Sequence, residues 1–134
     1  MMVVDASVLA TALADDTDEG DSARERLRED PDLHAPNLVD LEVLSTFRHR
    51  ARAGELDGRR AALAVEDLAS LPLQRYPHHP FLERVWELRG NLTPYDAAYV
   101  ALAEMIGCVL VTADARLARA PAVHCEIEVV ATRE

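Results

Sequence analysis

The sequence contains no lysine, and all of its 14 basic residues are arginine. This absence excludes enzymes whose chemistry depends on a lysine side chain, among them P-loop nucleotide hydrolases, protein kinases and Schiff-base enzymes. Phosphoryl transfer on an aspartate, as in receiver domains and haloacid-dehalogenase-like phosphatases, is disfavoured for the same reason, because both normally use a lysine. Any catalytic role therefore falls to other residue types.

Long hydrophobic runs are also missing, since no stretch approaches the ~20 apolar residues of a membrane helix. The opening segment MMVVDAS lacks the positive region of a signal peptide. We therefore expect a cytoplasmic protein with no membrane association. The two cysteines, Cys108 and Cys125, fit that compartment because neither belongs to a CxxC or other metal-type spacing. They are expected to be buried or idle thiols.

The formal net charge is −10, from 24 acidic and 14 basic residues. This balance argues against coating of nucleic acid by the whole surface, but it does not exclude a local basic site. A chain of 134 residues is long enough to bury a core without disulfides. We therefore expect one domain over residues 1–134.

Strand patterns alternate with helical patterns along the chain. Strands are predicted at 2–5, 33–35, 73–76, 108–112 and 127–130, and helices at 6–14, 21–29, 37–53, 59–71, 81–90, 94–106 and just after 114. The acidic segment DDTDEGD, residues 15–21, is predicted to be a solvated turn. The alternation predicts an α/β fold in three layers, with a mostly parallel central sheet flanked by helices.

Asp5 and Asp114 share one sequence context, since each follows an apolar strand and precedes a helix. Both are therefore expected at the carboxyl edge of the sheet, where ligands bind in open α/β folds. A purely structural role is open for each, because aspartate also caps helices.

Glu42 and Asp96 also occupy unusual positions. Glu42 lies in the apolar segment LVDLEVL, beside the face of the helix that is expected to be buried. Asp96 is in the first turn of the helix that follows Thr93, where the helix dipole favours a carboxylate. The alternatives are a half-exposed helix face for Glu42 and a capping box formed by Thr93 and Asp96.

Four carboxylates in one place would repel each other, and a hard divalent cation is the usual compensation. Mg²⁺ and Mn²⁺ take carboxylate and water oxygens, and such a site can activate water against a phosphodiester. Ser7 and Thr112 are hydroxyl residues close to these acids and are candidates to support them, although a cap or turn role is also open.

Four segments carry a resemblance to a known family: VVDASVLATAL at the start, P-x(5)-E over Pro36–Glu42, LTPYDAAYVALA, and LVTADARLA. Together they resemble PIN-domain nucleases, and most closely the VapC toxins of bacterial toxin–antitoxin pairs. The resemblance covers essentially the whole chain and implies a PIN-like α/β/α fold. It also implies an endoribonuclease dependent on Mg²⁺ or Mn²⁺, a homodimer, and inhibition by a small VapB-type antitoxin.

The catalytic acids implied by this resemblance are Asp5, Glu42, Asp96 and Asp114. We expect Asp5, Asp96 and Asp114 to hold the cation and Glu42 to orient the cation or its water. The alternative is a protein of the same fold that processes or binds RNA, or binds a partner, with little cleavage activity of its own. Cleavage that depends on the acids would distinguish the two.

Five arginines follow Glu42 within a short segment: Arg48, Arg50, Arg52, Arg59 and Arg60. Their guanidinium groups suit phosphate, and Arg48, Arg50 and Arg52 are the candidates to bind the RNA backbone. The alternative is a solvated helix face that balances the acidic surface.

Three further features favour structural roles. His78 and His79, in the segment PHHP, have no third ligand nearby in the sequence and are assigned to a surface loop. Phe81 and Trp86 have helical spacing with Val85 and are predicted to pack in the core or at a dimer interface rather than to stack on bases.

Overall fold

The computed structural model describes residues 1–130, and residues 131–134 of the predicted single domain lie outside the described residues. The described strands are β1 (Met2–Val4), β2 (Leu33–Pro36), β3 (Leu73–Tyr76), β4 (Val109–Thr112) and β5 (Ile127–Val129). The described helices are α1 (Ala6–Ala14), α2 (Asp18–Glu29), α3 (Val39–Arg52), α4 (Gly58–Ser70), the 3₁₀ helix η1 (His79–Phe81), α5 (Leu82–Glu87), α6 (Pro94–Ile106) and α7 (Ala115–Ala118). The predicted α/β class is confirmed.

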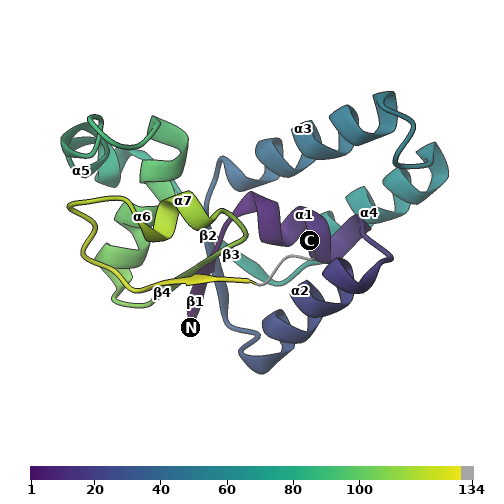
Figure 1. The fold of residues 1–134 in the computed structure, drawn as a ribbon, viewed down its shortest axis with the longest axis horizontal. Helices are drawn as coiled ribbons and strands as arrows, with labels where there is room; N and C mark the ends of the chain where they lie inside the picture. The colour runs from purple at the N-terminus through teal and green to yellow at the C-terminus, as the bar shows by residue number, and fades with distance from the viewer. Residues whose placement is uncertain (131–134) are drawn as a thin grey trace.

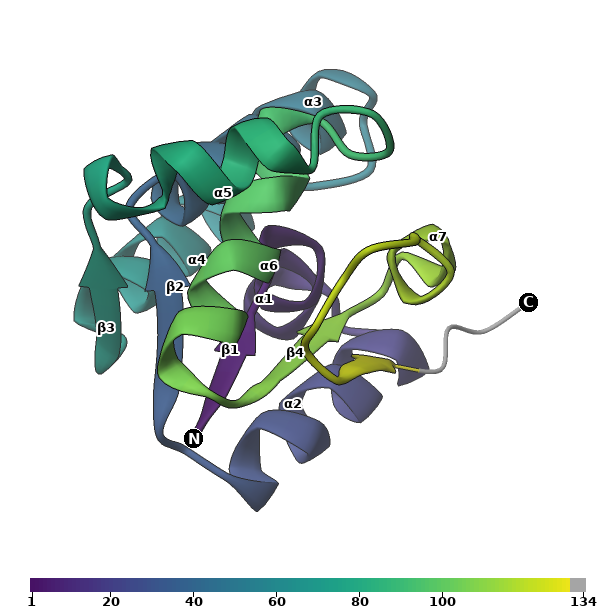
Figure 2. The same ribbon diagram turned by 90° about the vertical axis from the view of Figure 1, so that its left-hand side faces the viewer.

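The five strands form one sheet in the order β3-β2-β1-β4-β5, and every pairing between neighbours is parallel. Helices α1 to α4 lie on one side of this sheet, whereas α5 and α6 lie on the other (Figures 1 and 2). The predicted three layers are therefore confirmed. Parallel strands covered on both faces are buried, which explains the continuous β-branched runs in β1 and β4.

The order of the strands places a change of direction between β1 and β4. From β1 the chain moves outward to β2 and β3, and it then returns across the sheet to β4 and β5 on the other side of β1. In doubly wound sheets, ligands bind beside the carboxyl ends of the strands at this point of reversal. Asp5 follows the end of β1 and Asp114 follows the end of β4, so both lie at this point.

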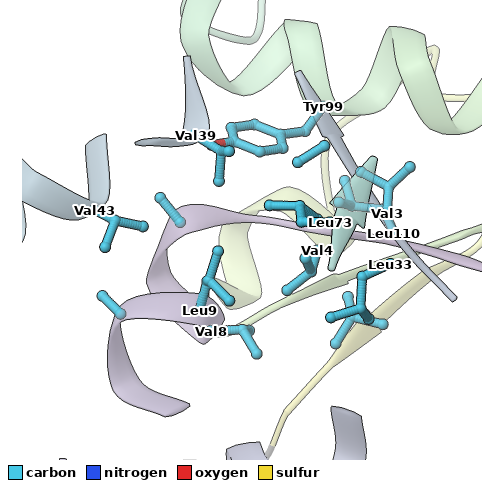
Figure 3. Packing of buried hydrophobic residues seen from close by; sticks show 14 of the residues in the cluster. Val3, Val4, Val8, Leu9, Leu33, Val39, Val43, Leu73, Tyr99 and Leu110 are labelled. Carbon is cyan, nitrogen blue, oxygen red and sulfur yellow. The ribbon is translucent and has the colours of Figure 1, made fainter. Parts of the chain in front are cut away.

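The core lies on both faces of β1, the central strand. Val3 and Leu110 are partners in register, and both are fully buried. Figure 3 shows residues of this core, among them Val4, Leu9 and Tyr99. None of the helices within residues 1–130 is long and apolar enough to span a membrane.

The acidic segment 15–21 is not wholly a turn, because α2 already begins at Asp18. Asp18, Glu19 and Asp21 occupy the first helical turn, where the helix dipole stabilises negative charge. Gly20 permits this start, because a Cβ atom there would lie 1.7 Å from the carbonyl oxygen of Asp15. The predicted solvated turn did not take into account that acids stabilise the N-terminal turn of a helix.

The helix predicted over 81–90 is shorter, since a 3₁₀ turn at His79–Phe81 leads into α5, which ends at Glu87. Phe81 is buried as predicted, but Trp86 is 68% exposed and is not part of the core. The guanidinium of Arg89 lies over its ring at 4.5 Å from the centroid. Trp86 was predicted to pack in the core or at a dimer interface, and its exposure excludes the core, because so short a helix covers α6 with only part of its surface.

Candidate active site

A pocket of about 320 Å³ lies at the carboxyl edge of the sheet, beside the ends of β1 and β4. All four acids singled out from the sequence line it. Its lining residues are Asp5, Ala6, Ser7, Glu42, Ser45, Thr46, Asp96, Tyr99 and Asp114. The fold therefore brings together residues that follow β1 and β4 and residues of α1, α3 and α6, which are far apart in the sequence.

Asp5 is the most deeply buried of the four acids, with 7% of its surface exposed. Its Oδ1 accepts hydrogen bonds from Ser7 Oγ at 2.6 Å and from Val8 N at 3.2 Å. Its Oδ2 accepts a hydrogen bond from Thr112 Oγ1. Burial raises the pKa of Asp5, and the hydrogen bonds from Ser7 and Thr112 oppose this rise. The Asp5 carboxylate therefore both caps α1 and lines the pocket.

Ser7 and Thr112 connect Asp5 to the segment that carries Asp114. Ser7 Oγ accepts a hydrogen bond from Ala113 N at 3.2 Å, and Thr112 Oγ1 accepts one from Asp114 N at 3.0 Å. Each hydroxyl therefore donates to Asp5 and accepts from the backbone that follows β4. This arrangement fixes the ends of β1 and β4 relative to each other.

Glu42 lies on α3 and is half-buried at the pocket. Tyr99 on α6 donates a hydrogen bond from its hydroxyl to Glu42 Oε1 at 2.6 Å. Burial raises the pKa of Glu42, the Tyr99 hydrogen bond opposes this rise, and the charges of Asp96 and Asp5 add to it. Tyr99 is itself buried, and its pKa is raised by burial and by Glu42, so it remains a hydrogen-bond donor.

Asp96 is in the first turn of α6 and half-buried. Its backbone N–H donates to Thr93 Oγ1 at 3.2 Å, which confirms that Thr93 caps the helix. Burial raises the pKa of the Asp96 carboxyl, and the neighbouring charge of Asp114 raises it further. Asp96 is thus held at the pocket by a well-capped helix, without an ion pair of its own in the described chain.

Asp114 differs from the other three acids because it has an arginine partner. Arg116 binds it through Nε at 3.1 Å and Nη2 at 2.8 Å, and the Arg116 backbone N–H donates to Oδ1 at 2.9 Å. These hydrogen bonds lower the pKa of Asp114. The Arg116 side chain is 82% exposed, so its guanidinium can move away from Asp114 without disturbing the core.

The donor set is suited to a hard divalent cation, because the four acids supply carboxylate oxygens. With the side chains as they lie, no three acidic, histidine or cysteine groups within residues 1–130 are arranged to hold a metal ion. The hydrogen bonds explain this, since both oxygens of Asp5 face hydroxyls and both oxygens of Asp114 face Arg116. The mutual repulsion of the acids is the property that a cation would relieve.

The arginines predicted to bind RNA lie at the far end of α3 from Glu42. Arg48 and Arg52 are exposed, and neither forms an ion pair with a residue of the described chain. Arg50 is partly buried and lies 4.0 Å from a carboxylate oxygen of Glu55. None of the three lines the pocket, so their assignment to RNA stays a prediction.

Arg59 and Arg60 belong to α4 rather than α3. Arg60 binds Asp16 and the carbonyl oxygen of Leu13 at 2.9 Å, so it fastens α4 to α1.

Two residues that bind acids of the site through their side chains were missed from the sequence. Tyr99 was counted only as part of an apolar helix, although it lies three residues after Asp96 and therefore on the same helical face. Arg116 follows Asp114 by two residues, the spacing at which an aspartate side chain binds the local backbone. In both cases the signal was the distance along the chain from an acid already singled out.

Comparison with known proteins places the chain in a family. The PIN domain family matches residues 2–123. Ribonuclease VapC9 of Mycobacterium tuberculosis is 45% identical over 133 residues, which cover 97% of this chain and 98% of that protein. Ribonuclease VapC1 of the same species is 41% identical over 129 residues, 96% of each chain.

Solved structures share the fold. The toxin VapC20 of Mycobacterium tuberculosis, which cleaves the sarcin–ricin loop, has a TM-score of 0.68 at 20% identity, covering 90% of this chain and 95% of its own. VapBC2 from Rickettsia felis, solved on a DNA fragment from its promoter, has a TM-score of 0.70 at 14% identity, covering 96% and 97%. The family match and the identities over nearly the whole length show that this chain belongs to the PIN-domain family and, within it, to the VapC ribonucleases.

Proposed function

We propose that this chain is a Mg²⁺- or Mn²⁺-dependent endoribonuclease, a single-domain toxin that acts in the cytoplasm and is neutralised by a VapB-type antitoxin. The observation that carries the proposal is one pocket lined by Asp5, Glu42, Asp96 and Asp114 in a chain that belongs to the VapC ribonucleases. The raised pKa values of Asp5, Glu42 and Asp96 support it, because perturbed carboxylates gathered in a cleft are typical of functional sites.

In this proposal, Asp5, Asp96 and Asp114 hold the cation. When bound, the cation supplies positive charge that activates water for attack on a phosphodiester and stabilises the oxygen that leaves. Ser7 and Thr112 keep the Asp5 carboxylate in place, and the Asp114 carboxylate becomes available when Arg116 turns away. Glu42, held by the Tyr99 hydroxyl, orients the attacking water.

RNA binding beside the pocket is assigned to Arg48, Arg50 and Arg52. Arg48 and Arg52 are exposed on the last turns of α3, the helix that also carries Glu42. Their guanidinium groups offer paired N–H donors to phosphate. Such local positive charge is needed because the chain as a whole carries −10.

The antitoxin is proposed to cover the first helices and to reach the acids with an arginine or lysine of its C-terminal segment. A groove of about 470 Å³ between α1, α2 and α4 supports this position, with an apolar floor of Leu9, Leu13 and Leu27. Arg60 and Asp16 form an ion pair at the same groove. A homodimer is part of the same proposal and is supported by large apolar side chains exposed on α3, α5 and α6: Leu41, Trp86 and Tyr95.

The test is cleavage of total cellular RNA by the purified chain with Mn²⁺ or Mg²⁺. Asp96→Asn keeps the shape of the side chain and removes its charge, and we expect it to reduce cleavage by about 10³-fold, the scale of losing one electrostatic contact at a reacting centre. Chelation of the metal by EDTA is expected to abolish cleavage. Glu66→Gln, an exposed acid on α4, is the matched control and is expected to cleave as the wild type does.

The outcomes separate the two functions left open by the sequence. Cleavage that survives both Asp96→Asn and chelation would contradict the assignment of the site. RNA that stays intact with the wild type, while the protein binds Mn²⁺ and RNA, would favour a binding protein of the same fold over a nuclease.

A further inference from the structure

The two cysteines of the chain lie at the end of the sheet opposite the acidic pocket. Cys108 immediately precedes β4, and Cys125 lies two residues before β5. Both are partly buried, and both line a pocket of about 390 Å³. Neither residue takes part in the proposed cleavage, so their proximity is a separate feature of the molecule.

The register of the sheet sets the two residues opposite each other. β4 and β5 are parallel, and Leu110 pairs with Ile127. This pairing is made by Leu110 N, which donates to the carbonyl oxygen of Glu126 at 2.9 Å, the slanted bond of a parallel ladder. Cys108 lies two residues before Leu110 and Cys125 lies two residues before Ile127, so the same register, continued beyond the ends of the two strands, sets the cysteines opposite each other.

This spacing is compatible with a disulfide. Neighbouring strands lie about 4.7–4.9 Å apart, and the Cα atoms of a disulfide usually lie about 4.4–6.8 Å apart. Paired Cα atoms of neighbouring strands therefore fall within the range that a disulfide spans. At the spacing of paired strands, a bond between Cys108 and Cys125 requires rotation of the side chains and little movement of the backbone.

The segment around Cys125 is held in place from several sides. Arg84 Nη2 donates to the carbonyl oxygen of Ala122 at 2.7 Å, and His124 N donates to Glu104 Oε2 at 2.6 Å. Glu104 in turn binds Arg84 at 2.7 Å, so both anchors belong to one ion pair between α5 and α6. Cys125 is thus fixed between His124 and β5, which keeps it at the pocket that it shares with Cys108.

We propose that Cys108 and Cys125 form a reversible intramolecular disulfide, which fastens the edge strand β5 to β4 when the protein meets an oxidant. A metal site is the other use for neighbouring thiols. Within residues 1–130, however, His124 and the nearby glutamates do not combine with the cysteines into a group that can hold a metal ion. The geometry therefore favours the disulfide.

The oxidant is a low-molecular-weight disulfide such as glutathione disulfide. One protein thiolate attacks a sulfur of the oxidant, an S–S bond forms to the protein, and one glutathione leaves as its thiolate. The second protein thiol loses its proton to solvent and attacks the protein sulfur of this mixed disulfide. The second glutathione leaves, so the protein gives up two electrons and two protons and two molecules of glutathione are formed.

The surroundings make this exchange slow near neutral pH. Burial raises the pKa of Cys108, and burial together with the charge of Glu104 raises the pKa of Cys125 to about 11. The thiolate is the attacking species, so the rate should increase as the pH rises. The bond therefore forms under sustained oxidation rather than in brief exposure.

The experiment incubates the full chain with glutathione disulfide near pH 7 and at about pH 9, then blocks free thiols and measures intact mass and linked peptides. We expect loss of the mass of two hydrogen atoms, a peptide that links Cys108 to Cys125, a monomer on a non-reducing gel, and reversal by a dithiol. The oxidised protein should unfold several degrees higher, because the bond closes the segment between the two cysteines in the unfolded chain.

Two variants test the register itself. Cys125→Ser should take up one glutathione and form no internal bond. The double variant Cys108→Ser, Val109→Cys moves the thiol to the other face of β4, and it should also form no internal bond with Cys125. Stable glutathione adducts on both wild-type cysteines, cross-linked dimers, unmodified thiols at about pH 9, or an internal bond in the double variant would each overturn the proposal.

Discussion

Acids at the carboxyl edge of the sheet and acids on its outer helices and strands have opposite electrostatic surroundings. Glu104 binds Arg84 at 2.7 and 3.0 Å, and Glu128 binds Arg26 through both of its oxygens. The arginine partners help to lower the pKa of Glu104 and Glu128. At the pocket, by contrast, burial raises the pKa of Asp5, Glu42 and Asp96, and none of these three forms an ion pair within residues 1–130.

This contrast shows which acids stabilise the fold through ion pairs and which do not. Several arginines form ion pairs that connect the outer elements, for example Arg75 with Asp40 and Arg60 with Asp16. The pocket acids are instead held by hydroxyls, which orient a carboxylate without neutralising it. Asp114 stands between the two groups, because Arg116 pairs with it from an exposed position. Unneutralised charge at one edge is what a cation site requires.

The largest effect on stability is expected at a paired acid. Glu104→Gln removes the charge that binds Arg84 and weakens the acceptor for His124 N. The Glu104 side chain is only 14% exposed, so we expect the free energy of unfolding to fall by about 1–3 kcal/mol, the range for a hydrogen bond to a charged group. Chemical denaturation measures this loss. RNA cleavage by the folded variant should stay close to that of the wild type.

Glu126→Gln is the matched control for this variant, since Glu126 is an exposed acid close to the same pocket. Its stability should stay within about 0.5 kcal/mol of the wild type, as for most surface substitutions. Equal losses from Glu104→Gln and Glu126→Gln would remove the distinction between paired and solvated acids.

A smaller effect, on cleavage and its pH dependence, is expected from removing the Tyr99 hydroxyl that orients Glu42. Tyr99→Phe removes the hydrogen bond to Glu42 Oε1, and this bond favours the charged form of the carboxyl. The pKa of Glu42 should therefore rise further in this variant. The acid limb of the cleavage profile should move to higher pH, and cleavage should fall by about 10-fold on that limb and little on the plateau above it.

Tyr95→Phe is the control for Tyr99→Phe, because Tyr95 lies on the same helix and is 62% exposed. It should leave both the rate and the pH profile unchanged. A uniform loss of cleavage at every pH in Tyr99→Phe would show that the hydroxyl supports the fold of the pocket and does not act on the titration of Glu42.

Much of the fold follows from periodicity, since the strands and most helices of the described chain lie within one or two residues of their predicted positions. The exceptions are two places where composition or spacing was interpreted without knowing where the helix begins and ends. Asp18, Glu19 and Asp21 are acidic enough for a solvated turn, yet they stabilise the first turn of α2. Trp86 has the spacing of a core residue, but α5 is too short to bury it.

The placement of Asp5 and Asp114 at one edge was also predictable, because parallel strands all end on the same side of a sheet, whereas the family resemblance implied that Glu42 and Asp96 join them. Hydrogen-bond partners were not, because they depend on which side chains from separate elements meet. Tyr99 and Glu42 lie on α6 and α3, and no local pattern connects them. The opposed cysteines needed the strand register, which becomes known only when β4 and β5 are paired.

The smallest effect on stability is expected from removing the charge of a pocket acid. This change in the free energy of unfolding should have the opposite sign to the change caused by Glu104→Gln. The pKa of Asp96 is raised in the folded protein, so its charged form destabilises the fold. The contribution of Asp96 to the free energy of unfolding should therefore decrease as the pH rises from about 4, the unfolded pKa of aspartate, through the folded pKa.

Asp96→Asn carries no such charge, so it should be more stable than the wild type near neutral pH. The gain should be no more than about 1 kcal/mol, because Asp96 is half-buried and solvent screens its charge. It should disappear as the pH falls below about 4, where Asp96 is protonated in both states of the wild type. Urea denaturation across this pH range measures the difference, and Glu66→Gln controls for a change of net charge alone. A loss of stability in Asp96→Asn would mean that its carboxylate is a stabilising partner, as Glu104 is, and would erase the contrast between the two regions.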